Sequence, residues 1–359
     1  MKRLIWLFVL TCLMTVSAHA VSELPESLTE SLPDNTRDFL EEVEFSGTEG
    51  FSAGLWNIVG SLSEYAEEIL HRQIKGTVLI FSIVLLCSLV EGIYKCVEGT
   101  GNYVLSMVAT LSITLVAAGN MDSLIGAGTE TIRQLREFSK ILFPVLITAT
   151  AGTGAVTTAT FQQVTVVVLV DLLLGLIHGL LVPLIYLYIG VLAAASCFSS
   201  EGLSGVAEGM KKMIVWMLST GLILFTLYLS IVRVIAGNVD GTAVRMTKTA
   251  IAGMIPVVGG VIAEASETIL AGAGLLKNSV GIFGTLAVLG ICAYPFLQLG
   301  IQYLLYKLTA CCSMFVGQAR LCKLIQGLGG AFGLVLSMTG SCALLLLVSV
   351  FSCIAAVLP

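Results

Sequence analysis

Long apolar runs separated by short polar ones fill most of this sequence. The run from Met213 to Val232, for example, holds 20 residues without a charge. A helix needs about 20 mostly apolar residues to cross the hydrocarbon core of a bilayer, and an open sheet is not viable against lipid. The pattern therefore predicts an all-α polytopic membrane protein with about 6–8 transmembrane helices.

Two halves of the membrane region carry the same landmarks in the same order. AGNMD at 118–122 precedes a polar run, a proline-glycine segment and a long apolar segment, and AGNVD at 236–240 precedes the same series. The two prolines of each half are 39 residues apart, at Pro144 and Pro183 and again at Pro256 and Pro295. Such matched interruptions are typical of membrane proteins built from internal repeats. We predict a tandem repeat with units of about 100–212 and 213–330 and a closing helix at 331–359.

A glycine pair follows the first proline of each unit. Irregular backbone at membrane depth is tolerated where it is buried in protein or lines a cavity, so a re-entrant hairpin fits both places. These hairpins are candidate pathway elements, and their residues are Pro144, Gly152 and Gly154 in the first and Pro256, Gly259 and Gly260 in the second. Glu264 and Glu267 follow the second pair, where they would line a mouth or ion site, or form a solvated helix face.

The number of crossings depends on two segments that are too long for one straight span. Residues 164–198 would form a helix of about 52 Å, against a core of about 30 Å, and 280–316 poses the same choice. Each segment either kinks at its proline and crosses once, or folds back there and crosses twice. The two-crossing arrangement places seven basic residues inside and the one-crossing arrangement five, so the positive-inside rule favours eight spans with inverted repeats.

Composition and charge describe the amino-terminal region. Residues 1–20 have a positive start, an apolar core and an A-x-A end, which predicts a signal peptide. Residues 21–75 carry twelve acids and three basic residues, so we expect an acidic extracytoplasmic segment that binds neither nucleic acid nor anionic lipid. The remainder, 76–359, is the multi-pass membrane domain. The whole chain is 57% hydrophobic and 11% charged, far from the globular norm of about 25% charged.

Two polar segments have helical periodicity. The first has a stripe at Ile58, Leu62, Tyr65 and Ile69, and it fits either a docking helix for a partner outside the membrane or a helix lying on its own membrane domain. The second, Asp122–Lys140, carries apolar residues on one side and charges on the other, which predicts an interfacial helix.

Two ionisable residues lie within an apolar run. Asp171 and His178 are seven residues apart and share one helix face. Ionisable groups inside a membrane are pathway or proton-relay candidates, and the other interpretation is a polar contact that specifies packing. Corresponding prolines of the two halves are 112 residues apart, and at that offset Asp171 and His178 correspond to Phe283 and Gly290. Neither counterpart is ionisable, so the repeat favours the packing contact.

Motifs that carry chemistry are absent from the sequence. The ten cysteines form no C-x-x-C or Cys/His spacing, and free cysteine is by default a small buried hydrophobe. No phosphate loop, metal motif or nucleophile-base pattern occurs. We therefore expect no enzymatic activity, no cofactor and no metal.

The segment TKTAIAGMIPVVGGVIAEASETILAGAGLLKNSVGIFG, from Thr247 to Gly284, strongly resembles stage III sporulation protein AE of endospore-forming bacteria. The predicted signal peptide, acidic segment and polytopic remainder fit the layout of that family along the whole chain. The family has no assigned catalytic residues that could be transferred to this sequence.

The resemblance implies a membrane subunit of the channel or feeding-tube complex that links mother cell and forespore. Its implied partners are the sister stage III sporulation proteins AA to AH, stage II sporulation protein Q through the complex, and membrane lipid. The implied location is the mother-cell membrane facing the forespore. The alternative function is a self-contained secondary transporter of a small solute, for which repeats and broken helices are also expected.

Overall fold

The computed structural model describes residues 28–29, 32–33, 36–37, 47–95, 102–198, 200–254, 259–316 and 319–355. The predicted signal peptide, much of the acidic segment and Pro256 lie outside the described residues. The helical elements from residue 47 onward are, in chain order, α4 (Gly47–Lys95), α5 (Asn102–Gly152), α6 (Val156–Val164), the π-helical turn η1 (Thr165–Val170), α7 (Asp171–Leu176), the π-helical turn η2 (Ile177–Leu181), α8 (Val182–Phe198), α9 (Glu201–Met254), α10 (Gly259–Phe315) and α11 (Ala319–Ile354).

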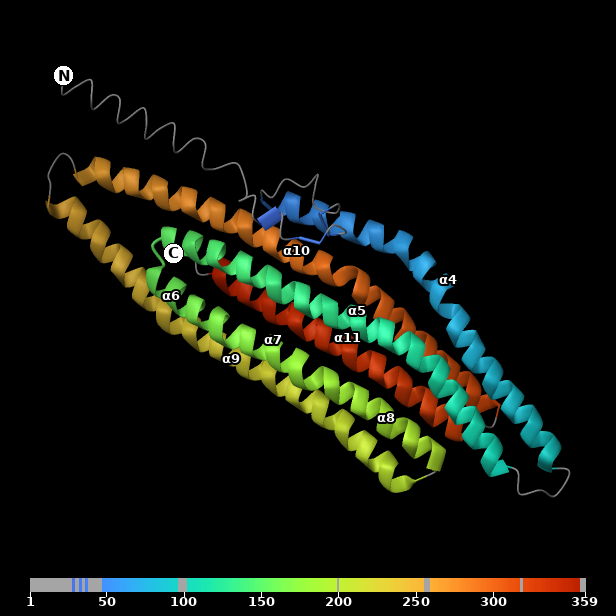
Figure 1. The fold of residues 1–359 in the computed structure, drawn as a ribbon. Helices are drawn as coiled ribbons and strands as arrows, with labels where there is room; N and C mark the ends of the chain where they lie inside the picture. The colour runs from blue at the N-terminus through green and yellow to red at the C-terminus, as the bar shows by residue number, and fades with distance from the viewer. Residues whose placement is uncertain are drawn as a thin grey trace.

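The helices form one elongated bundle whose axes run in nearly the same direction (Figure 1). α10 and α11 form its centre, because 67% and 61% of their most apolar windows are buried, against 22% for α4 and for α9. Within the described residues, six helical runs are long and apolar enough to cross a membrane. The all-α polytopic fold expected from the apolar pattern is therefore confirmed, with six candidate spans.

The three longest helices exceed the thickness of a bilayer. α5, α9 and α10 have 51, 54 and 57 residues, and at 1.5 Å per residue they measure about 77 to 86 Å. The hydrocarbon core is about 30 Å thick. Each helix therefore contains far more chain than one crossing requires.

The prolines do not break these helices. Pro144 lies inside α5 and Pro295 inside α10, while Pro183 is the second residue of α8. The ring of a helical proline clashes with the carbonyl four residues earlier, and for Pro183 that residue lies within η2. A wider π-helical turn accommodates such a clash.

Two expectations are corrected by this continuity. The preferred fold-back at Pro183 and Pro295 is wrong, because the chain is helical without interruption from Val156 to Phe198 and from Gly259 to Phe315. The predicted interruption at Pro144 in the first re-entrant hairpin is also wrong, because α5 continues through Pro144 to Gly152. The tandem repeat itself stays a prediction.

The glycine pair Gly152 and Gly154 does interrupt the helix, because α5 ends at Gly152. Gly154 has a φ of 86°, a left-handed conformation that glycine adopts without the steric cost of a side chain. The amides of Thr153 and Gly154 donate to the carbonyls of Thr150 and Ala151, at 3.2 and 3.0 Å. This is how a helix commonly ends, and the chain then reverses into α6.

α4 runs without a break from the acidic segment into the first apolar run. Ile58 and Ile69 are each 4% exposed, and the rings of Tyr65 and Tyr294 meet edge to face with centroids 5.8 Å apart. Tyr294 belongs to α10, so the amphipathic stripe lies on the protein's own membrane domain. Of the two interpretations of that stripe, this contact supports the intramolecular one.

Asp122–Lys140 is not a separate interfacial helix, because it forms the middle of α5. Nothing between Ala118 and Asp122 stops the helix, since Gly119 costs only about 1 kcal/mol relative to alanine in a helix. The predicted amphipathic pattern is nevertheless present. It places a charged face on a helix that is otherwise apolar at both ends.

Candidate functional site: the polar face of α5

One side of α5 combines charged, small and proline residues over its second half. Its members recur every three or four residues and are exposed or half-exposed, and we call them the α5 polar face: Gly126, Glu130, Arg133, Glu137, Lys140, Pro144, Thr148 and Gly152. The opposite side is buried, with Ile132, Leu135 and Phe138 at 1, 0 and 1% exposure. The 3.6-residue period of the helix thus separates a core side from a polar side.

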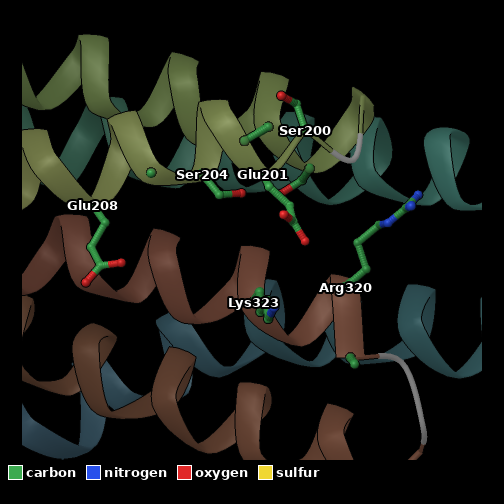
Figure 2. A pocket seen from close by; sticks show the side chains of 10 residues that line it. Ser200, Glu201, Ser204, Glu208, Arg320 and Lys323 are labelled. Atoms are coloured by element: carbon green, nitrogen blue, oxygen red, sulfur yellow. The ribbon is translucent and has the colours of Figure 1, made fainter.

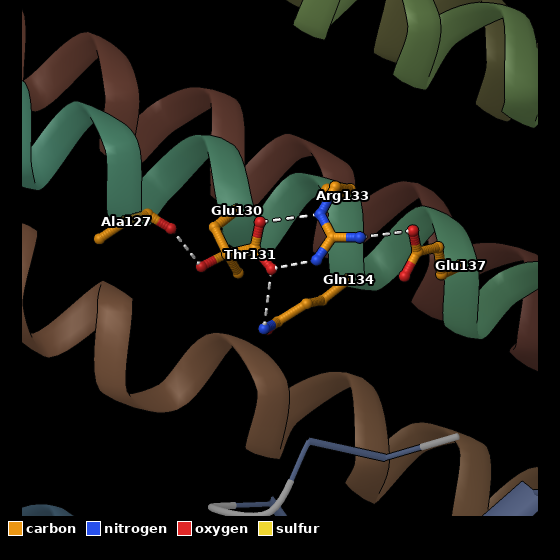
Figure 3. Close-up of polar contacts among 6 residues, drawn as sticks. All are labelled: Ala127, Glu130, Thr131, Arg133, Gln134 and Glu137. Atoms are coloured by element: carbon orange, nitrogen blue, oxygen red, sulfur yellow. Dashed lines mark hydrogen bonds and ion pairs between the residues drawn. The ribbon is translucent and has the colours of Figure 1, made fainter. Parts of the chain in front are cut away.

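Ion pairs run along this face within the helix (Figure 3). The Arg133 guanidinium donates to Glu130 through Nε at 2.8 Å and to Glu137 through Nη1 at 2.7 Å. Gln134 Nε2 adds a 3.3 Å bond to Glu130 Oε1. Residues three and four apart are neighbours on a helix, so the sequence spacing alone brings these groups together.

A third ion pair joins α5 to α7. Arg136 Nε and Nη2 donate to the two carboxylate oxygens of Asp171, at 2.5 and 2.7 Å. This fork geometry is the strong form of a charge-assisted contact. The side chains are 36% and 41% exposed, so the pair lies at the edge of the bundle rather than in its core.

The surroundings of Asp171 separate it from His178. Asp171 begins α7, directly after η1, whereas His178 lies exposed in η2. A Cβ added at Gly175, one turn after Asp171, would be 4.0 Å from Arg136 Nη2, an ordinary van der Waals contact, so the guanidinium lies beside this glycine. Asp171 therefore makes a helix-to-helix contact, and the structure does not join it to His178 as a relay.

The segment Asp122–Lys140 contains three acids and three basic residues, so its net charge is zero. It lies between two charge-free stretches, 103–121 and 141–170, and within a candidate span. A charged side chain in the centre of a bilayer costs at least about 2.5 kcal/mol. The α5 polar face is therefore expected to meet water or another polar protein surface rather than lipid tails.

A pocket of about 490 Å³ lies at the end of the bundle where α8 and α11 meet the start of α9. Glu201 and Glu208 come from α9, and Arg320 and Lys323 come from α11 (Figure 2). Glu208 also pairs with Lys212 at 2.9 Å on the outer surface. The mixed charges suit a polar group of no net charge better than a strong anion or cation.

Both acids of the duplicated AGNxD motif accept a hydrogen bond from another helix, a role the sequence did not predict. Asp240 is 2% exposed, and its Oδ1 accepts a 2.8 Å hydrogen bond from the Thr157 amide in the first turn of α6. It thereby satisfies one of the amides that a helix start leaves open. Asp122, its counterpart, accepts a longer 3.5 Å bond from the Tyr186 hydroxyl of α8. The duplication was the signal that could have pointed to both.

The second predicted hairpin is described only in part. Pro256 lies outside the described residues, Gly259 and Gly260 begin α10, and Glu264 and Glu267 fall within its first turns, with their side chains outside the description. Among the side chains that are described, no three of His, Cys, Asp or Glu gather as metal ligands would.

The fold and this site define a class: a multi-pass, all-helical membrane protein with a charged outer face on one spanning helix. The model of the stage III sporulation protein AE family matches residues 35–357, and the chain belongs to that family of sporulation proteins. The stage III sporulation protein AE of Bacillus subtilis (strain 168) is similar, with 25% identity over 283 residues that cover 78% of this chain and 69% of that protein. No solved structure matches the chain.

Proposed function

We propose that the chain is a non-enzymatic membrane subunit of the channel or feeding-tube complex that links mother cell and forespore and supports forespore development. Its place is the mother-cell membrane facing the forespore. Its partners are the sister stage III sporulation proteins AA to AH and, through the complex, stage II sporulation protein Q. Membership of the sporulation family supports this proposal.

The α5 polar face is the observation that carries the subunit role. Two acids and two basic residues of this face, Glu130, Glu137, Arg133 and Lys140, lie within a candidate spanning helix and are exposed or half-exposed on the outside of the single-chain bundle. By contrast, α9 presents large apolar side chains outward, including Ile223, Leu224 and Leu227 at 54 to 61% exposure. One side of the protein suits lipid, and the other requires water or protein. A subunit that assembles with other proteins around a water-filled path would place α9 against lipid and the α5 polar face against water or protein.

Accessibility to a charged, membrane-impermeant thiol reagent tests this orientation. Single cysteines are introduced at Gly126 and Thr148 on α5 and at Ile223 and Leu227 on α9, in a chain whose exposed Cys311 is replaced by serine. In membranes from sporulating cells, we expect labelling at both α5 positions and protection at both α9 positions. Protection on α5 together with labelling on α9 would contradict the proposal.

Assembly is tested by affinity purification of the full-length chain from sporulating cells. The sister stage III proteins should co-purify with the native chain. Replacing Arg133 and Glu137 together with leucine should reduce co-purification or forespore development, whereas replacing Ile223 and Leu224 with valine should not. Equal recovery and equal sporulation for both variants would count against the polar face as the assembly or channel surface.

The alternative, a self-contained secondary transporter, is favoured by the charges that Arg136 and Asp171 place within spanning helices. A transporter acts without partners, so the purified chain in proteoliposomes should move a solute, and Asp171→Ala or His178→Ala should abolish that movement. A subunit needs its partners, so the purified chain alone should be inactive in this assay.

A further inference from the structure

The pocket between the starts of α9 and α11 has acidic side chains on one wall and basic side chains on the other. Glu201 and Glu208 are seven residues apart on α9, about two turns, so they lie on one side of that helix. Arg320 and Lys323 are three residues apart on α11 and are likewise neighbours. Figure 2 shows Glu201 and Arg320 extending from the two helices into the space between them. A ligand that contacts both walls would therefore carry a negative group and a positive group.

The size of this pocket suits a small molecule rather than a single ion. Its volume of about 490 Å³ lies within the range of about 300–1,000 Å³ that is typical of small-molecule sites. Three hydroxyl groups complete the polar lining, those of Ser196, Ser200 and Ser204. A hydroxyl group both donates and accepts hydrogen bonds, so these serines suit the oxygens of a phosphate ester as well as an ammonium group.

The pocket lies at the level where three charge-free stretches of chain begin or end. Residues 179–200 end at the pocket, residues 213–232 begin beyond Glu208, and residues 324–354 begin directly after Lys323. Each stretch has the length of about 20 residues that crosses the hydrocarbon core, and each lies within a candidate span. The charged lining therefore lies just outside the hydrocarbon, at the level of the lipid headgroups.

Exposed apolar side chains border the pocket. Phe198 is 64% exposed where α8 ends, and Phe315 is 87% exposed where α10 ends. On α9, Val206 is 52% and Trp216 66% exposed, and tryptophan is enriched where a membrane meets water. Large apolar side chains this exposed mark a surface that binds a membrane or another apolar partner. Acyl chains can therefore lie beside the helix ends while a headgroup enters the pocket.

We propose that this pocket, which we call the headgroup site (Ser200, Glu201, Glu208, Arg320 and Lys323), binds the zwitterionic headgroup of a phospholipid. The phosphodiester lies against Arg320 and Lys323, whose N–H groups donate to its oxygens. The ammonium group of the ligand lies against Glu201, whose carboxylate accepts from it. Because α9 and α11 both begin at the pocket, the positive ends of their dipoles add to the attraction for the phosphate.

The lining also selects among phospholipid headgroups. A primary ammonium group has three N–H donors, which the Glu201 carboxylate and the serine hydroxyls accept. A quaternary ammonium group, as in phosphatidylcholine, lacks these donors and is recognised by aromatic side chains, and none of the described residues that line the pocket is aromatic. An anionic headgroup, as in phosphatidylglycerol, brings no positive group to the two glutamates and is repelled by them. The headgroup that fits is therefore phosphoethanolamine.

Native mass spectrometry of the purified full-length chain in detergent tests the headgroup site. The chain is titrated with phosphatidylethanolamine, phosphatidylglycerol and phosphatidylcholine that carry identical acyl chains. We expect phosphatidylethanolamine to bind about tenfold more tightly than either of the others, which is the effect of one charge-assisted hydrogen bond. Equal affinities for the three lipids would overturn the proposal.

Two variants with matched controls separate the two walls of the pocket. Lys323→Gln removes a phosphate contact and should weaken the binding of phosphatidylethanolamine and phosphatidylglycerol alike. Glu201→Gln removes the ammonium contact and should bring the affinity for phosphatidylethanolamine down to that for phosphatidylglycerol. Lys75→Gln and Glu68→Gln, at exposed positions on α4, should change neither affinity. Pocket variants that behave like these controls would contradict the assignment of the site.

A headgroup without acyl chains distinguishes a lipid site from a site for a soluble zwitterion. Glycerophosphoethanolamine should bind at least about tenfold more weakly than phosphatidylethanolamine, because it has no chains to bury against the exposed Phe198 and Phe315. Equal affinity would indicate a soluble ligand and would overturn the lipid assignment. The headgroup site does not depend on the proposed function, since these measurements use the purified chain without the sister stage III proteins.

Discussion

Arg136 and Asp171, 35 residues apart in the chain, meet in a forked ion pair that ties α5 to α7. The pair lies beside two π-helical turns, η1 before Asp171 and η2 after α7. Such turns are rare and frequently occur at functional sites. The contact therefore fixes the register of α5 against a helical run whose regular geometry is interrupted by these turns.

A double-mutant cycle on this pair should give a coupling free energy of about 1 kcal/mol, because both groups are partly exposed and solvent screens their attraction. Arg136→Leu and Asp171→Leu should each lower the Tm in detergent, and the double variant should lower it by less than the sum. The control is Lys212 with Glu208, 76% and 67% exposed, whose coupling should be close to zero. Equal couplings in the two cycles would contradict the structural role of Arg136.

Replacing Gly154 with alanine should lower the free energy of unfolding by about 1–2 kcal/mol, because a side chain is disfavoured at its φ of 86°. The measurement is thermal unfolding of the purified protein. Gly126→Ala is the matched control, since it lies inside α5 with no other atom near an added Cβ. That change should be neutral or slightly stabilising, and the reverse order of the two effects would rule out the left-handed turn.

Removing the Asp240 carboxylate should loosen the start of α6. Asp240→Ala leaves the Thr157 amide without its acceptor and should cost about 1 kcal/mol, seen as faster hydrogen exchange at the first amides of α6. Asp240→Asn keeps an acceptor oxygen and should stay close to the native protein. Exchange that is unchanged in both variants would show that the contact does not hold the helix.

Neighbouring residues on α4 should respond differently to truncation. Ile69 is 4% exposed and Leu70 is 43% exposed. Ile69→Ala should destabilise the protein by about 2–5 kcal/mol, and Leu70→Ala should have a small effect. If α4 instead used its apolar stripe for an external partner, Ile69→Ala would weaken partner binding without lowering the Tm of the isolated chain.

Cysteines at Thr153 and Ser200 mark the two ends of the run from α6 to α8. Because that run is uninterrupted, an impermeant thiol reagent added from one side should label only one of them, and permeabilisation should expose the other. Labelling of both from the same side would restore the two-crossing arrangement.

Local patterns were enough for several of these features. The charged and apolar faces of Asp122–Lys140 follow from helical periodicity, which holds wherever that helix ends, so Ile132 and Phe138 are buried as expected. The interruption near Gly152 and Gly154 likewise follows from the conformational freedom of glycine. The fold-backs predicted at the prolines do not occur. Whether a proline ring breaks a helix depends on its surroundings, such as a π-helical turn or neighbouring helices that accommodate the clash, and a local pattern does not show these.

The sequence by itself determined that this protein is a helical, multi-pass membrane protein, where its apolar runs lie and which family it belongs to, because these depend on composition and on order along the chain. Only the tertiary structure decided that Asp171 pairs with Arg136, that Asp240 caps α6, and that Gln73 of α4 bonds to the Gln298 carbonyl of α10. Those contacts join residues from different helices. The helices' relative rotation and register are set by packing of the whole bundle, which no short stretch of sequence encodes.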